Sequence, residues 1–152
     1  MSSEDLVAAF GRAMQEYQRA VDLLDQRVAE RLGLNRTDMR CLELLLEPEG
    51  AAMSPGELAV AAGLTTGGVT TAIDRLERAG YVTRERDAGD RRRVTVRPTP
   101  LAQQSAWELY GPIVTAGGEF LRRYSDEVLQ SMIEVLEFST GQYDEHAKRI
   151  KD

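Results

Sequence analysis

The pattern of apolar and polar positions is mostly helical along this chain. From Leu6 to Val28, apolar residues recur at spacings of three and four with charged or amide residues between them, which predicts one long helix ending near Gly33. The apolar positions are Leu6, Phe10, Met14, Tyr17, Val21, Leu24 and Val28. A second helix is predicted from Asn35, where Asp38 three residues later resembles a capping box.

The middle of the chain carries two further helix starts. In "SPGE", Ser54 is an N-cap, proline occupies the first helical position and Glu57 reaches back, so a short helix should run to Gly63. After a turn, Thr65 or Thr66 opens another helix that ends near Gly80. The predicted inward positions of this helix are Val69, Ala72, Ile73 and Leu76. Two short helices joined by a glycine-containing turn form a helix-turn-helix pattern.

A β-hairpin is predicted directly after these helices. Residues 81–86 and 93–97 alternate with period two around "DAGD", which places the turn at Ala88 and Gly89. Thr99 and Pro100 then start a helix that should kink at "YGP", and a last helix follows Ser125. The fold class predicted is mainly α with a small β-hairpin wing, in which residues 35–97 form a winged helix-turn-helix domain.

The remaining helices, in residues 1–34 and 98–152, carry apolar stripes that so small a domain cannot cover. Their simplest partners are the same helices of a second copy, so we expect a dimerisation region and a two-fold homodimer. The alternative is a monomer whose terminal helices fold back onto the winged domain.

Charge is distributed unevenly along the sequence. The formal net charge is −6, yet six arginines and no lysine lie between Arg84 and Pro100. Localised positive charge on an acidic chain indicates a face for nucleic acid, although a solvated charged surface is the alternative because acidic residues are interleaved. The acidic N-terminus does not resemble a signal peptide and no apolar run is long enough to span a membrane, so we expect a cytoplasmic protein.

The predicted recognition helix is the one that begins at "TTGGVTTAIDR". Small hydroxylated residues on its outer face allow close approach to base edges and phosphates. Paired glycines lower helix stability but let the backbone approach a phosphate, whereas an ordinary N-cap region is the structural alternative. The candidate DNA-binding residues of this helix are Thr65, Thr66, Gly67, Gly68, Thr70, Thr71 and Arg75.

The hairpin supplies the second set of candidates. Alternation along the strand sends Arg92 to the opposite face from Arg91 and Arg93, so one arginine can probe a groove while another holds phosphate. A narrow minor groove attracts an inserted arginine, and Asp90 could orient that guanidinium by a bidentate pair. A solvated, salt-bridged hairpin tip is the alternative. The candidate DNA-binding residues of the hairpin are Arg84, Arg86, Asp90, Arg91, Arg92 and Arg93.

These motifs together resemble the MarR family of bacterial transcriptional regulators. The resemblance rests on "ELAVAAGLTTGGVTTAIDRLERAGYVTRERD", the wing motif "DRR" and "VTVRPTPLA", with Pro98 and Ala102 where the family usually has leucine and glycine. It implies a homodimer that represses transcription on pseudo-palindromic double-stranded DNA, with Arg92 in the minor groove and Asp90 as its support. It also implies release by a small phenolic or other anionic ligand, or by oxidation of a cysteine.

The resemblance places an effector pocket between the dimer helices and the winged domain. Its candidate residues here are Tyr17, Met39, Arg40, Trp107 and Tyr110, each of which could instead belong to the core or an interface. The single cysteine, Cys41, lies in the second helix and fits a buried inert thiol, whereas the family's peroxide sensors generally carry theirs in the first helix.

Other functional classes have little support in the sequence. One cysteine and one histidine provide too few ligands for a metal site, and neither a metal nor another cofactor is expected. We find no Ser/His/Asp or Cys/His constellation and no phosphate loop, so the chain is not expected to be an enzyme. The surviving alternative is a winged-helix module that binds protein and not DNA.

Overall fold

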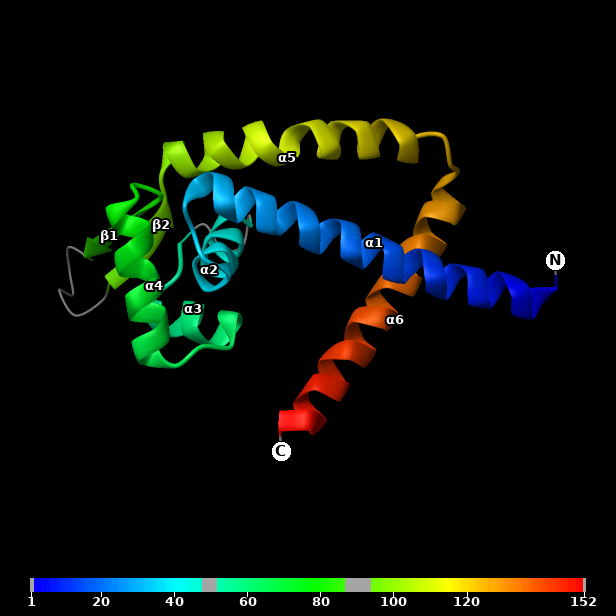
Figure 1. The fold of residues 1–152 in the computed structure, drawn as a ribbon, viewed down its shortest axis with the longest axis horizontal. Coiled ribbons are helices and arrows are strands. Elements are labelled where there is room, and N and C mark those ends of the chain that lie inside the picture. The colour runs from blue at the N-terminus through cyan, green and yellow to red at the C-terminus, as the bar shows by residue number, and fades with distance from the viewer. Residues whose placement is uncertain (1, 48–51, 87–93, 152) are drawn as a thin grey trace. The chain divides into compact units, whose positions relative to one another are not determined.

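The architecture is helical with one hairpin inserted before the last two helices. The structure is a computed structural model that describes residues 2–47, 52–86 and 94–151. Along the described residues the order is α1 (Ser3–Leu32), α2 (Arg36–Leu46), α3 (Pro55–Ala62), α4 (Thr66–Arg78), β1 (Val82–Arg86), β2 (Val94–Pro98), α5 (Pro100–Leu121) and α6 (Asp126–Lys151) (Figure 1). This confirms the predicted fold class.

Helix ends occur where the sequence signals place them. Ser2 and Ser54 each form a complete capping box, and Thr65 caps α4 by accepting a hydrogen bond from the Gly68 N–H at 3.1 Å. Gly33 and Gly63 end α1 and α3 with φ of 68° and 67°, a left-handed conformation that favours glycine. Local capping chemistry therefore sets the lengths of the helices around the helix-turn-helix.

The two strands pair as an antiparallel hairpin. Arg84 lies opposite Val96, and the flanking pairs extend from Val82 with Pro98 to Arg86 with Val94. The Val96 N–H does not bond to β1 but to the Met53 carbonyl at 2.7 Å, which adds an isolated bridge on the outer side of β2. The predicted hairpin is thus confirmed, while its predicted turn at Ala88 and Gly89 lies outside the described residues.

The core lies between α2, α3, α4, the hairpin and the start of α5. All four inward positions predicted for α4 are fully buried there. Ala102 is buried at the start of α5, and Thr99 joins this start to the preceding structure by accepting from the Ala102 N–H and donating to the Gly80 carbonyl. The core cluster contains Cys41, Leu42, Leu44, Leu45, Leu58, Ala59, Val69, Ala72, Ile73, Leu76, Val82, Val96 and Ala102.

The chain divides into two compact units, Met1–Leu109 and Tyr110–Asp152. The division falls inside α5, which continues as a helix through Pro112. The first unit contains α1 together with the winged helix-turn-helix. The second unit consists of the end of α5 and the whole of α6. No helix in the described part of the chain has both the length and the apolar character needed to cross a bilayer.

Candidate nucleic-acid interface

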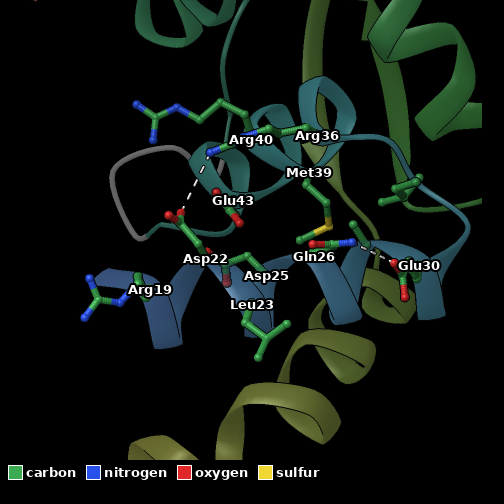
Figure 2. Close-up of a pocket in the computed structure, with 12 residues that line it drawn as sticks. Arg19, Asp22, Leu23, Asp25, Gln26, Glu30, Arg36, Met39, Arg40 and Glu43 are labelled. Atoms are coloured by element: carbon green, nitrogen blue, oxygen red, sulfur yellow. Dashed lines mark hydrogen bonds and ion pairs between the residues drawn. The ribbon is translucent and has the colours of Figure 1, made fainter. Parts of the chain in front are cut away.

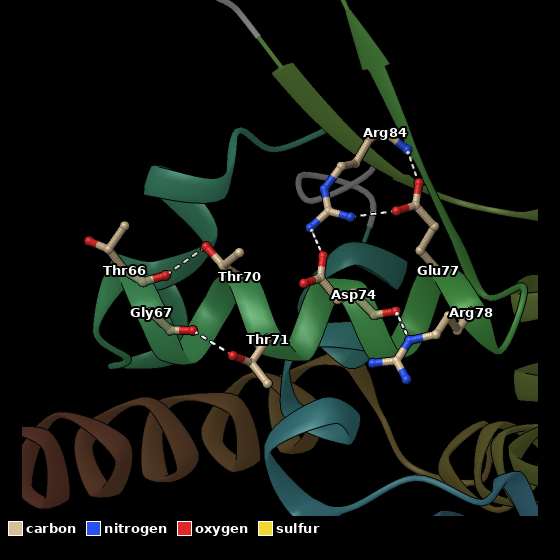
Figure 3. Close-up of polar contacts among 8 residues, drawn as sticks. All are labelled: Thr66, Gly67, Thr70, Thr71, Asp74, Glu77, Arg78 and Arg84. Atoms are coloured by element: carbon tan, nitrogen blue, oxygen red, sulfur yellow. Dashed lines mark hydrogen bonds and ion pairs between the residues drawn. The ribbon is translucent and has the colours of Figure 1, made fainter.

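The first two turns of α4 form an outer surface of small residues. Thr66, Gly67, Thr70 and Thr71 are all exposed, because the opposite face of the helix is buried in the core. The two threonine hydroxyls donate to carbonyls of their own helix, Thr70 Oγ1 to Thr66 O at 2.8 Å and Thr71 Oγ1 to Gly67 O at 2.9 Å (Figure 3). With their hydrogens used in this way, both side chains offer an acceptor oxygen and a methyl group.

That pair of groups matches chemistry found on base edges. A hydroxyl oxygen can accept a hydrogen bond from the amino group of adenine or cytosine in the major groove. A methyl group can pack against the methyl of thymine. The start of α4 is therefore suited to read bases without a charged side chain.

The two glycines of α4 differ in their surroundings. A Cβ at Gly68 would lie 3.3 Å from Thr65 Oγ1, the atom that caps the helix, so glycine has a structural reason at this position. A Cβ at Gly67 would meet nothing within 4 Å, and its φ is not in the left-handed region. The free chain thus gives no structural reason for glycine at position 67.

Arg84 contacts α4 and does not extend freely into solvent. Its guanidinium donates to Asp74 Oδ1 at 2.5 Å and to Glu77, and its backbone N–H donates to Glu77 Oε1 at 3.3 Å (Figure 3). Burial lowers the pKa of Arg84, but the hydrogen bonds to the two carboxylates and their negative charges together raise it by more. The two acidic partners were not identified from the sequence, although their spacing of three places them on one side of the helix.

Arg75 is likewise held, on the side of α4 that faces α2. Its Nε donates to Asp38 Oδ2 at 2.8 Å and a terminal nitrogen donates to Asp38 Oδ1 at 2.6 Å, a bidentate pair in which Asp38 is 2% exposed and Arg75 36%. The hydrogen bond to Asp38 raises the pKa of Arg75. This arrangement corrects the predicted capping box, because Asn35 does accept from the Asp38 N–H but the Asp38 carboxylate binds Arg75.

The wing is described only at its base. Arg86 is exposed at the end of β1. The other predicted wing residues, Asp90, Arg91, Arg92 and Arg93, lie outside the described residues, so their assigned roles stay predictions.

A cavity of about 760 Å³ lies between α1 and α2, within the first unit (Figure 2). Met39 and Arg40, two of the five effector candidates, line this cavity, but the other three do not gather there. Tyr17 lines a separate hollow along α1, Trp107 is 65% exposed and Tyr110 belongs to the second unit. The full lining comprises Arg19, Asp22, Leu23, Asp25, Gln26, Ala29, Glu30, Leu34, Arg36, Met39, Arg40 and Glu43.

Carboxylates, which the sequence reasoning did not single out, are prominent in this cavity. Glu43 from α2 and Asp25 from α1 approach one another, and burial together with the charge of Asp25 raises the pKa of Glu43 (Figure 2). At the rim, Arg36 lies 3.8 Å from an oxygen of Asp22, and both side chains are well exposed. The cavity therefore combines an apolar floor around Met39 with polar walls of both charges.

Cys41 lies in the core, behind the surface that faces the cavity. It is fully buried, and burial raises the pKa of its thiol to about 11. Because the thiolate is the reactive form, this cysteine is unreactive near neutral pH.

Comparison with known proteins places this geometry in a family. The model of the MarR family matches residues 32–93. The uncharacterized HTH-type transcriptional regulator YcgE of Bacillus subtilis (strain 168) is 36% identical over 129 residues, which cover 85% of this chain and 82% of that protein.

Solved structures show the same fold at lower identity. A MarR family protein from Bacillus stearothermophilus superposes with a TM-score of 0.65 at 20% identity, covering 95% of this chain and 99% of that one. NadR in complex with 4-hydroxyphenylacetate gives a TM-score of 0.60 at 19% identity, covering 84% and 89%. With a helix-turn-helix, a hairpin and flanking helices all in this order, the chain belongs to the MarR family and is a DNA-binding transcriptional regulator.

Proposed function

We propose that the protein is a cytoplasmic repressor that binds a pseudo-palindromic operator as a homodimer and leaves it when a small molecule binds. In this proposal α4 enters the major groove and the hairpin tip contacts the adjacent minor groove. The observation that carries the proposal is the exposed start of α4, where Thr66, Gly67, Thr70 and Thr71 present small side chains, acceptor oxygens and methyl groups.

Uncovered apolar side chains support the homodimer. Large apolar residues at least half exposed occur near the start of α1 and again along the last turns of α6, and exposed apolar patches of this kind mark interaction sites. They are Leu6, Val7, Phe10, Phe138, Tyr143 and Ile150. A two-fold dimer that covers them would present two copies of α4 to two half-sites.

The cavity between α1 and α2 supports release by a ligand. Its volume of about 760 Å³ is within the range that holds drug-sized molecules. An anionic or phenolic ligand would find a cation in Arg40 and an apolar surface at Met39. The structure of NadR with 4-hydroxyphenylacetate shows that a protein of this fold accommodates such a molecule.

The DNA-binding part of the proposal is tested by selecting bound duplexes from a random pool and titrating them at several salt concentrations. A dimer that neutralises six or more phosphates should lose roughly a thousandfold or more in affinity between about 50 and 200 mM salt. Arg92→Ala should weaken binding strongly while sedimentation still shows a dimer. A flat salt response would contradict the operator-binding proposal, and unchanged affinity of Arg92→Ala would remove the wing assignment.

The ligand part is tested with 4-hydroxyphenylacetate as the first probe. Binding in the cavity should raise the melting temperature of the protein and release the selected duplex. Arg40→Ala should lower the affinity for the probe and leave DNA binding unchanged. Stabilisation that persists in Arg40→Ala would place the ligand elsewhere.

A further inference from the structure

Two carboxylates follow the small-residue surface of α4. Asp74 lies one helical turn after Thr70, and Glu77 lies three residues further on. Their side chains are 49% and 42% exposed, so both carboxylates are part of the surface that would approach DNA in the proposed function. Negative charge at this place opposes phosphate binding unless a neighbouring cation compensates it.

The compensating cation comes from the wing. Arg84 lies in the middle of β1 and reaches both carboxylates with its guanidinium, while its backbone N–H bonds to one of them. This N–H is not needed by the hairpin, because Val96, its partner residue on β2, bonds to Met53 instead. Side chain and backbone of one residue thus attach the hairpin to the recognition helix.

We propose that Arg84 is a positioning residue that fixes the wing hairpin relative to α4, and so sets the geometry with which helix and wing together recognise DNA. This inference rests on the proposed function. Arg84 has its guanidinium directed at two carboxylates, which already compensate its positive charge, so its net attraction for a phosphate is small. Arg84 therefore contributes specificity through geometry, and not affinity through a phosphate contact.

Asp74→Asn separates the two roles through the ratio of affinities for selected and scrambled duplexes, because the loss of one negative charge by itself favours both duplexes. If Arg84 bound phosphate, loss of the neighbouring negative charge would free it and tighten binding to every duplex. If Arg84 positions the wing, Asp74→Asn should weaken binding to the duplex selected by the wild type at least tenfold relative to a scrambled duplex. The ratio of affinities for selected and scrambled duplexes of equal length should fall, with the salt dependence unchanged.

Arg84→Lys and Arg86→Ala complete the comparison. Arg84→Lys keeps the charge but loses the planar fork, so it should behave as Asp74→Asn does. Arg86 is an exposed arginine on the same strand, and Arg86→Ala should reduce the slope of log affinity against log salt by about 0.9 for each phosphate that the variant no longer neutralises. An unchanged ratio of affinities for selected and scrambled duplexes in Asp74→Asn, or in Arg84→Lys, would overturn the proposal.

Amide hydrogen exchange gives a readout that does not need DNA. In Arg84→Lys and Asp74→Asn the amides of β1, including that of residue 84, should exchange faster, whereas Arg86→Ala should match the wild type. Unchanged exchange in the first two variants would also overturn the proposal. If the wild type does not distinguish selected from scrambled DNA, the proposed function fails, and the exchange result still decides whether Arg84 fixes the hairpin.

Discussion

Gly67 offers a sharp test of how closely α4 approaches DNA, because stability and binding should change in opposite directions. In Gly67→Ala the added Cβ meets no atom within 4 Å and the backbone conformation suits alanine. Replacing glycine at such a position stabilises a protein by about 0.4–1 kcal/mol, mainly by restricting the unfolded chain. For a chain of this size that corresponds to a rise in melting temperature of roughly 1–4 °C.

DNA binding should move the other way. If the backbone at Gly67 lies against the duplex, the new methyl group occupies contact space, and a steric misfit of one methyl group costs about 1–3 kcal/mol in a packed interface. That is roughly a five- to 150-fold loss of affinity. Thermal unfolding and mobility-shift titration on the selected duplex measure the two effects in the same preparation.

Gly56 and Gly68 provide matched controls. Gly56 has the same position in α3 that Gly67 has in α4, two residues after the N-cap, and a Cβ there would have only the Ser54 hydroxyl at 4.0 Å. Gly56→Ala should raise stability similarly and change DNA affinity less. Gly68→Ala should raise stability less than Gly67→Ala does, because its Cβ would lie 3.3 Å from the Thr65 oxygen that caps α4. Wild-type DNA affinity in Gly67→Ala would refute close backbone approach and leave Gly67 as an ordinary helix-start residue.

Three further predictions concern α2. Asp38→Asn should lower the melting temperature, since it weakens the bidentate pair with Arg75 and leaves an amide in a buried site; an unchanged melting temperature would contradict a stabilising role. Burial and a neighbouring carboxylate raise the pKa of Glu43 above its unfolded value, so its ionisation destabilises the fold as pH rises through that interval. Glu43→Gln should therefore raise the melting temperature at pH 7 and leave it unchanged at a pH below the unfolded pKa; an equal effect at both would rule out the titration. Cys41 should react with a thiol reagent only on unfolding, and rapid labelling of the native protein at pH 7 would contradict its burial.

Most of the fold could be predicted because its signals are local. Ser2, Ser54 and Thr65 each cap a helix through a residue three positions away, and Gly33 and Gly63 end helices through their own backbone conformation. The inward face of α4 follows from helical periodicity alone. These features can be predicted from neighbouring residues alone, without knowing the tertiary structure.

The candidate site was harder to predict because its polar contacts join distant residues. Asp38 has a local partner in Asn35, which suggested a cap, whereas its carboxylate binds a residue 37 positions away. A signal was present, since Asp38 shares the inward face of α2 with Leu42 and Leu45 and a buried carboxylate needs a cation. Arg84 similarly shares strand parity with the buried Val82, which indicates a side chain directed toward the domain.

The effector candidates were predicted from the place that the family resemblance gives the pocket, and not from contacts that the sequence itself indicates. Tyr17 and Trp107 are large and amphipathic, but nothing in their spacing along the sequence brings them to Met39 and Arg40. The residues that line the cavity are instead those on the faces of α1 and α2 that oppose one another. That is a tertiary relation, which the period of each helix leaves open.

The position of the core along the sequence has a consequence for synthesis of the protein. Every residue of the core cluster lies between Cys41 and Ala102, so the winged domain has all of its core before the last third of the chain is made. At translation rates of about 5–20 residues per second, this module has seconds to fold on the ribosome before α6 is complete. The DNA-reading unit can therefore fold before the C-terminal apolar surface is made, and this order would limit the time for which that surface coexists with an unfolded winged domain.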